Sequence, residues 1–213
     1  MGKLFNLDAP IVQWMGKIGQ MMVSTVIWLL CCLPVVTIGA ATVALYRIMF
    51  NLKEDRSCAL KVYFQTFRES FWKATALWLL LLVCGAILLG LYFLMVQVEN
   101  MILRLVVLAI FCLLFFTVYF YSLYAFPLTA YFENTLAGTI RNAIGMSIGN
   151  LRYTIIACAV TLIPLVMAIL VPKLFLQMLY LWMILGPGAL AYGVCCALSP
   201  VFQRYIPGNE EEC

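Results

Sequence analysis

The stretch LLCCLPVVTIGAATVALYR, residues 29–47, decides how the N-terminal part of this chain folds. It begins inside an apolar run long enough to cross a membrane, but Pro34 interrupts that run before the first charge, Arg47. Proline lacks a backbone N–H and disfavours helix at the residue before it. We therefore predict that the first membrane helix ends near Pro34 and that the chain re-enters as a short helix from Ala40 to Met49.

The residues after the proline suit such a break. In lipid, a carbonyl group freed by proline needs another hydrogen-bond donor, and the hydroxyl of Thr37 can supply one. Gly39, Ala40 and Ala41 are small enough to let a neighbouring helix approach closely. We expect that neighbour to be the third or the fifth membrane span.

The composition places the chain in a membrane. Of its 213 residues, 66% are hydrophobic and only 10% are charged, whereas soluble domains carry about 25% charged residues. A span needs roughly 20 apolar residues, and five segments qualify: 18–36, 72–96, 102–126, 154–171 and 174–197. We predict an all-α integral membrane protein, a single polytopic domain over residues 1–213. Pro127 and Pro187 lie near the cytoplasmic ends of the third and fifth spans, where we expect further breaks.

The basic residues predict an orientation. With five spans, one side of the membrane carries Lys3, Lys17, Arg104 and Lys173, and the other side carries the rest of the 13 lysines and arginines. Cytoplasmic loops hold the excess of basic residues. The N-terminus is therefore expected outside and the C-terminus in the cytoplasm.

The cytoplasmic segment 51–73 has the pattern of an amphipathic helix. An apolar row, Leu60, Phe64, Phe67 and Phe71, is typical of a helix lying in the membrane interface. Charged residues fall on the other side, and Glu69 and Lys73 have the spacing of a favourable pair. This helix is either an anchor leading into the second span or a docking surface. In the second case the candidate partner contacts are Lys61, Arg68 and Glu69.

A second amphipathic segment, 132–150, is predicted on the same side. Its apolar row is Leu136, Ile140, Ile144 and Ile148. Gly145 and Gly149 form a small-residue pair of the kind that lets two helices approach closely. Arg141, Gly145 and Gly149 are candidate partner contacts, although packing within the chain would explain the glycines equally.

Catalytic chemistry is not indicated. The chain has no histidine, and its nine cysteines form no C-x-x-C pair, so we expect no metal site and no cofactor. No charged residue lies deep in a span, and no glycine-rich phosphate loop is present. The net charge of +4 is a topology signal, and no nucleic-acid partner is expected. We expect a protein that is not an enzyme, in contact with membrane lipids.

Three stretches of the chain resemble a known protein family: LPVVTIGAATVALYR, YFQTFRESFWKATALW and YAFPLTAYFEN. They resemble the YesL-like family, small integral membrane proteins of Gram-positive bacteria with no established activity. The matching positions are Leu33, Pro34, Thr37, Ile38, Gly39, Ala40, Phe64, Phe67, Phe71, Lys73, Tyr124, Phe126, Pro127 and Leu128.

The resemblance implies a bacterial cytoplasmic membrane and a genomic setting beside carbohydrate ABC importers and two-component sensors. We therefore expect a non-enzymatic accessory or regulatory subunit that contacts the permease or ATPase subunits of such an importer. Two alternatives stay open: a stand-alone transporter or channel for a small solute, and a membrane partner of a sensor kinase.

Overall fold

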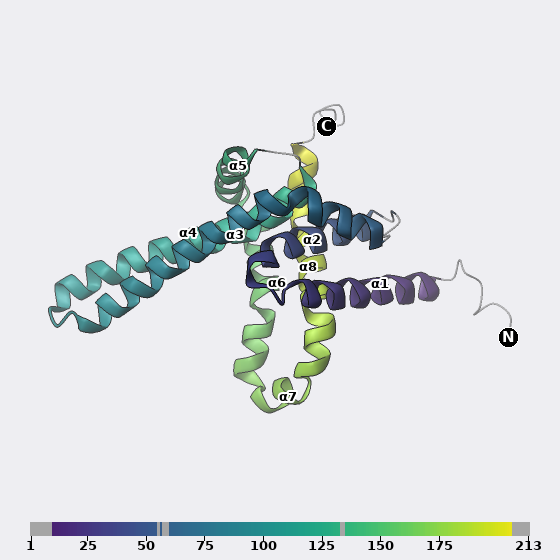
Figure 1. Cartoon of the computed structure of the whole chain (residues 1–213). Coiled ribbons are helices and arrows are strands. Elements are labelled where there is room, and N and C mark those ends of the chain that lie inside the picture. The colour runs from purple at the N-terminus through teal and green to yellow at the C-terminus, as the bar shows by residue number, and fades with distance from the viewer. Residues whose placement is uncertain (1–9, 55, 57–59, 133–134, 206–213) are drawn as a thin grey trace.

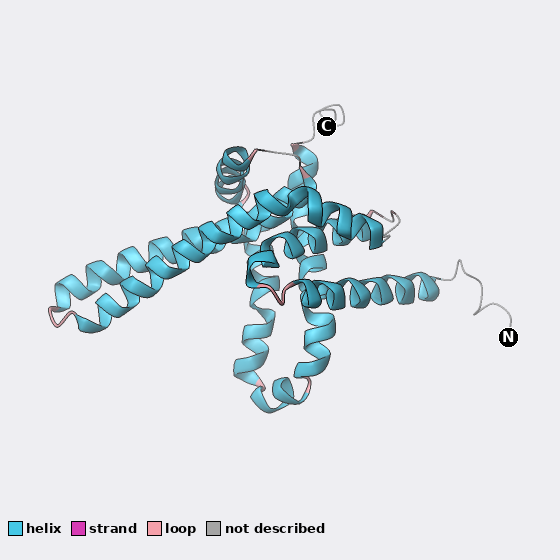
Figure 2. Ribbon diagram, in the orientation of Figure 1, coloured by secondary structure: helices cyan, strands magenta, loops and turns pink. Residues whose placement is uncertain are grey.

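The computed structural model of the chain describes residues 10–54, 56, 60–132 and 135–205. Every regular element within these ranges is a helix (Figure 2), which confirms the predicted all-α fold. The elements are α1 (Pro10–Cys31), η1 (Val35–Thr37), α2 (Ile38–Lys53), α3 (Leu60–Gln97), α4 (Met101–Tyr131), α5 (Leu136–Gly149), α6 (Leu151–Leu170), α7 (Pro172–Gln177) and α8 (Leu179–Arg204).

The helices form a hub with two arms. The hub contains the buried core and consists of α2, the first half of α3, the last turns of α4, α5 and the second half of α8. One arm is the α3–α4 hairpin and the other is α6–α7–α8, and they leave the hub in different directions (Figure 1). The single helix α1 packs against α2 and α8 and extends from the hub in a third direction. Leucine, isoleucine, valine and phenylalanine side chains are exposed along both arms, as suits contact with lipid. The chain is therefore not one bundle of parallel rods.

Within the residues that the structure describes, six helices are long and apolar enough to cross a membrane, one more than the sequence predicts. The additional one is the segment Val35–Lys53, which contains α2. More than half of it is buried inside the protein, at 56%, a larger share than in any of the other five. We conclude that α2 is held mainly by other helices, and α3, α4, α8 and α1 all pack against it.

The break predicted at Pro34 is present. α1 ends at Cys31, Pro34 is extended with φ −79° and ψ 117°, and α2 begins at Ile38. The indole N–H of Trp28 donates a hydrogen bond to the Thr42 hydroxyl over 3.2 Å, so α2 folds back beside α1. The re-entrant helix is longer than the predicted segment from Ala40 to Met49.

Thr37 supplies the hydrogen bond that the break needs. Its hydroxyl oxygen lies 2.5 Å from the carbonyl oxygen of Cys31 and 2.6 Å from that of Pro34. A hydroxyl has a single proton, so it donates to one carbonyl at a time. The end of α1 is therefore capped by a side chain that follows the break.

Thr37→Val tests this cap. The valine keeps the branched shape but removes the donor, and we expect the free energy of unfolding to fall by about 1 kcal/mol. Thermal unfolding of the detergent-solubilised protein measures the change. Thr37→Ser retains the hydroxyl and is the control. Equal stability of the valine and serine variants would show that the carbonyl groups do not depend on Thr37.

Gly39 and Ala40 lie where α2 meets α3. A Cβ atom built on Gly39 would lie 2.9 Å from both the carbonyl carbon of Ala74 and the Cβ of Trp78, and Ala40 is fully buried. The neighbour at Gly39 is thus the second span, α3, which was not predicted. The re-entrant helix α2 also packs against α4 and α8, the predicted third and fifth spans.

Two proline predictions were wrong. α4 continues through Pro127 to Tyr131, and α8 continues through Pro187. Pro127 lies between the buried residues Phe126 and Leu128, so hub packing holds the helix together despite the lost N–H. A proline is tolerated in a membrane helix where its neighbours compensate in this way.

The first amphipathic segment was predicted as an interfacial helix of its own, but α3 runs without a break from Leu60 to Gln97. The segment therefore leads directly into the second span, as one of its two alternatives expected. Its aromatic row is also divided. Phe67 and Phe71 pack against the hub, whereas Leu60 and Phe64 are 51% and 53% exposed. The second segment is a separate helix, α5. The fifth expected span is divided into the short α7 and the long α8.

Candidate functional site at the hub

A polar cavity lies in the hub where α2, α3 and the end of α4 meet. Its volume is about 430 Å³, and residues 130–132 close one side. We call it the Arg47 pocket. Its other lining residues are Arg47, Thr66, Glu69, Ser70, Lys73 and Thr129. Two cations, one carboxylate, three aliphatic hydroxyls and the Tyr131 side chain thus surround a single cavity.

Arg47 is placed by the end of α4. One terminal nitrogen of its guanidinium group, Nη1, donates a hydrogen bond to the carbonyl oxygen of Ala130 over 3.0 Å. The last four carbonyl groups of a helix have no partner within the helix, and the helix dipole makes that end attractive to a cation. Arg47 therefore joins α2 to α4 and keeps its remaining N–H groups near the cavity.

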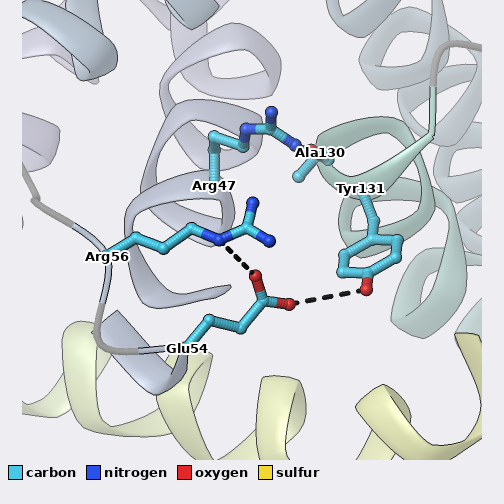
Figure 3. Close-up of polar contacts among 5 residues, drawn as sticks. All are labelled: Arg47, Glu54, Arg56, Ala130 and Tyr131. Atoms are coloured by element: carbon cyan, nitrogen blue, oxygen red, sulfur yellow. Dashed lines mark hydrogen bonds and ion pairs between the residues drawn. The ribbon is translucent and has the colours of Figure 1, made fainter. Parts of the chain in front are cut away.

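A second polar group lies beside Arg47 (Figure 3). The Glu54 carboxylate forms an ion pair with the Arg56 guanidinium, at 3.1 Å, and accepts a weak hydrogen bond from the Tyr131 hydroxyl, at 3.5 Å. Tyr131 also lines the Arg47 pocket. This links the end of α2 to the end of α4 a second time.

Aromatic rings support this corner of the hub. The centroid of the Phe50 ring lies 4.9 Å from that of Tyr131 and 5.8 Å from that of Phe202. The Phe132 and Phe202 rings are 5.7 Å apart. Ring pairs at these distances attract each other beyond the area they bury. α2, α4 and α8 are therefore packed rigidly behind the pocket.

The candidate contacts on α3 lie on its outer face. Lys61, Arg68 and Glu69 are exposed, and with Phe64 and Gln65 they line an open hollow. The expected pair between Glu69 and Lys73 is not formed, since Glu69 accepts a hydrogen bond from Gln65 at 2.9 Å. Glu69 lies between this hollow and the Arg47 pocket, because it lines both.

The candidate contacts on α5 lie at a different part of the hub. Arg141 and Gly145 line a cavity of about 510 Å³ together with Tyr205 of the segment that follows α8. No atom outside its own helix lies within 4 Å of a Cβ built on Gly145 or on Gly149. The two glycines therefore do not serve helix packing within the described part of the chain. Their contact with a partner stays a prediction.

Among the described residues, no group of three or more histidine, cysteine, aspartate or glutamate side chains is arranged to hold a metal ion. The described cysteines are free thiols, mostly in apolar surroundings. What the hub offers is a charged cavity and two polar faces that can bind a partner.

Residues 21–90 match the family model for DUF624, a protein of unknown function. The YesL-like family is known by this name. The DUF624 segment comprises the second half of α1, the break at Pro34, α2 and most of α3. It therefore contains the contact of Gly39 with α3 and five of the residues lining the Arg47 pocket, among them Arg47 and Lys73. No curated protein and no solved structure gave a match.

Sequence reasoning missed Arg47 and Lys73 as members of one site. Each is a single charge at the edge of a long apolar run. The pattern indicates Arg47 only as a topology signal and Lys73 also as a spacing partner of Glu69. The available signal is that both residues lie in stretches that carry the family resemblance. Only the fold of α2 onto α3, however, brings residues 26 positions apart to the same cavity.

Proposed function

We propose that this protein is a non-enzymatic accessory subunit that binds another membrane protein at the cytoplasmic end of its hub. The observation that carries the proposal is the outer face of α3. A helix of 38 residues is about 57 Å long, but only about 20 residues cross a bilayer. The charged start of α3 therefore extends beyond the hydrocarbon.

The chemistry of this face favours a protein partner. Lys61, Arg68 and Glu69 carry charges of both signs, and Phe64 is exposed among them. A face that binds the lipid surface alone is typically basic. Mixed charges around an exposed aromatic ring instead suit a complementary protein surface, where charge pattern gives specificity. From the family resemblance, we propose the permease or ATPase subunits of a carbohydrate ABC importer as the partner.

The orientation of this proposal places the C-terminus and the start of α3 in the cytoplasm. Five crossing helices put the N-terminus outside. If α2 crosses as a sixth helix, the N-terminus moves to the cytoplasmic side, and Lys3 and Lys17 join the basic side. Both arrangements satisfy the rule for basic residues, and both leave the outer face of α3 in the cytoplasm. A reporter enzyme fused to the N-terminus distinguishes them.

Arg68→Glu tests the proposed contact. We expect it to reduce the partner that copurifies from native membranes at least about tenfold, because like charges placed together at an interface cost more than about 1.4 kcal/mol. Quantitative mass spectrometry of the complex isolated in mild detergent gives the measurement. Arg104→Glu is the matched control, since Arg104 is also exposed but lies at the far tip of the α3–α4 arm.

Four results would contradict the proposal. Importer subunits could copurify in equal amounts with Arg68→Glu and with Arg104→Glu. They could also be absent from the preparation of the unaltered protein. A sensor kinase recovered in their place would favour the signalling alternative. Solute movement by the purified protein alone in liposomes would favour the transporter alternative.

A further inference from the structure

We propose that the Arg47 pocket binds the phosphate group of an anionic phospholipid from the cytoplasmic leaflet. This site adjoins the outer face of α3 that carries the proposed protein contact, and the two share only Glu69. It needs no protein partner, so the two proposals can fail independently.

The cations of the pocket are available for an anion. A guanidinium group carries five N–H donors, and Arg47 uses one of them on the Ala130 carbonyl. Lys73 forms no ion pair or hydrogen bond with any described residue. Charge-assisted hydrogen bonds from arginine and lysine to phosphate are among the strongest in proteins. A phosphate group that reaches both Arg47 and Lys73 would accept a charge-assisted hydrogen bond from each.

The remaining polar groups fit the rest of a headgroup. The hydroxyls of Thr66 and Ser70 line the cavity and can donate to phosphate oxygens or accept from a ligand. The Thr129 hydroxyl donates its proton to the Ala125 carbonyl over 2.7 Å, so it can only accept from a ligand. The Glu69 carboxylate only accepts hydrogen bonds, and it already holds the Gln65 amide. It repels phosphate but accepts well from a headgroup hydroxyl. This combination favours a phosphate ester that also carries hydroxyl groups, such as phosphatidylglycerol.

The pocket lies at the level of the headgroups. Trp72, next to Lys73, is 82% exposed, and tryptophan is enriched at the membrane–water interface. Beyond Lys73, α3 becomes continuously apolar, and α4 reaches the pocket after an apolar stretch of similar length. Basic pockets between membrane helices on the cytoplasmic side are suited to anionic headgroups. The cavity is also concave, and its volume of about 430 Å³ is within the range of small-ligand sites.

The test compares the full-length protein in nanodiscs of phosphatidylcholine alone with nanodiscs that also contain phosphatidylglycerol. We expect phosphatidylglycerol to raise the melting temperature and to be retained in native mass spectra. Lys73→Gln should weaken this retention about fivefold, which matches the contribution of one basic residue near an anionic surface. Lys73 is exposed and unpaired among the described residues, so this variant is expected to fold.

Lys61→Gln is the matched control, because it removes the same charge from the same helix outside the pocket. An equal loss of retention in Lys61→Gln and Lys73→Gln would show general surface attraction and overturn the proposal. Inorganic phosphate added to phosphatidylcholine nanodiscs forms the third arm. If it stabilises the protein while phosphatidylglycerol gives no advantage, the site binds free phosphate and the lipid assignment is wrong.

Discussion

Gly39→Val is expected to prevent this protein from remaining folded in mild detergent. A Cβ atom at residue 39 would meet the carbonyl group of Ala74 and the Cβ atom of Trp78. These atoms belong to the α3 backbone or are attached directly to it, so no change of rotamer removes the clash. Overpacking a core costs about 1–3 kcal/mol, and a rigid partner places valine at the upper end. α2 would have to separate from α3.

The measurement is the fraction of monodisperse protein after heating, followed by size-exclusion chromatography. Gly90→Val is the matched control, because Gly90 also lies in the α2–α3 half of the chain but no atom outside its own helix lies within 4 Å of a Cβ there. Gly39→Ala should fall between the two, since it adds the clashing atom without the branches. If Gly39→Val and Gly90→Val have the same melting temperature, the close approach of α2 to α3 does not exist in solution.

Thr154→Val is expected to give the second large loss of stability, about 1–3 kcal/mol. The hydroxyl of Thr154 lies 2.9 Å from the Ser147 carbonyl oxygen and 2.8 Å from the Tyr124 hydroxyl. A carbonyl cannot donate, so Thr154 gives its single proton to a carbonyl and Tyr124 donates to Thr154. Both side chains are buried. Valine would leave two buried polar groups without their partners, one on α4 and one on α5.

Two further variants separate this chain of bonds from simple packing. Tyr124→Phe should cost less than Thr154→Val, because Thr154 still donates to its carbonyl partner. Thr117→Val is the control, since the exposed Thr117 hydroxyl bonds only its own helix, at Leu113. Urea or thermal unfolding in detergent gives the ranking. A larger loss for Tyr124→Phe than for Thr154→Val would reverse the assigned direction of the bond.

These two sites explain how the hub holds the arms. Gly39 fixes α2 on α3, and Thr154 connects α6 with α4 and α5. The arms beyond the hub contact each other at few places, and the Tyr119 hydroxyl within 2.5 Å of the Thr161 hydroxyl is one of them. Stability is therefore expected to be most sensitive to substitutions in the hub, and the exposed apolar arms to be more tolerant.

Local signals in the sequence were sufficient for several features. The near-absence of charge requires a lipid-embedded fold. Pro34 alone predicts the end of α1, because a missing N–H and a steric clash act within one helical turn. Thr37 was identified as the donor for the same reason, since it follows the proline by three residues.

Features that depend on long-range packing were not predicted correctly. Pro127 and Pro187 have the same local signal as Pro34, yet α4 and α8 continue through them because buried neighbours hold the helices. The amphipathic start of α3 has the pattern of an interfacial helix, yet it continues straight into the membrane span. Phe67 packs against the buried core of the hub, whereas the pattern alone assigned it to the membrane interface.

The sequence by itself determined that the chain is helical and membrane-embedded, where α1 ends, and that it contains no histidine. These properties follow from composition or from contacts within one turn. Only the tertiary structure decided that α2 folds back into a hub and that Gly39 meets α3. It also placed Arg47 and Lys73 around one cavity. Such contacts join residues far apart in the chain, and their geometry depends on how whole helices cross, which no local pattern specifies.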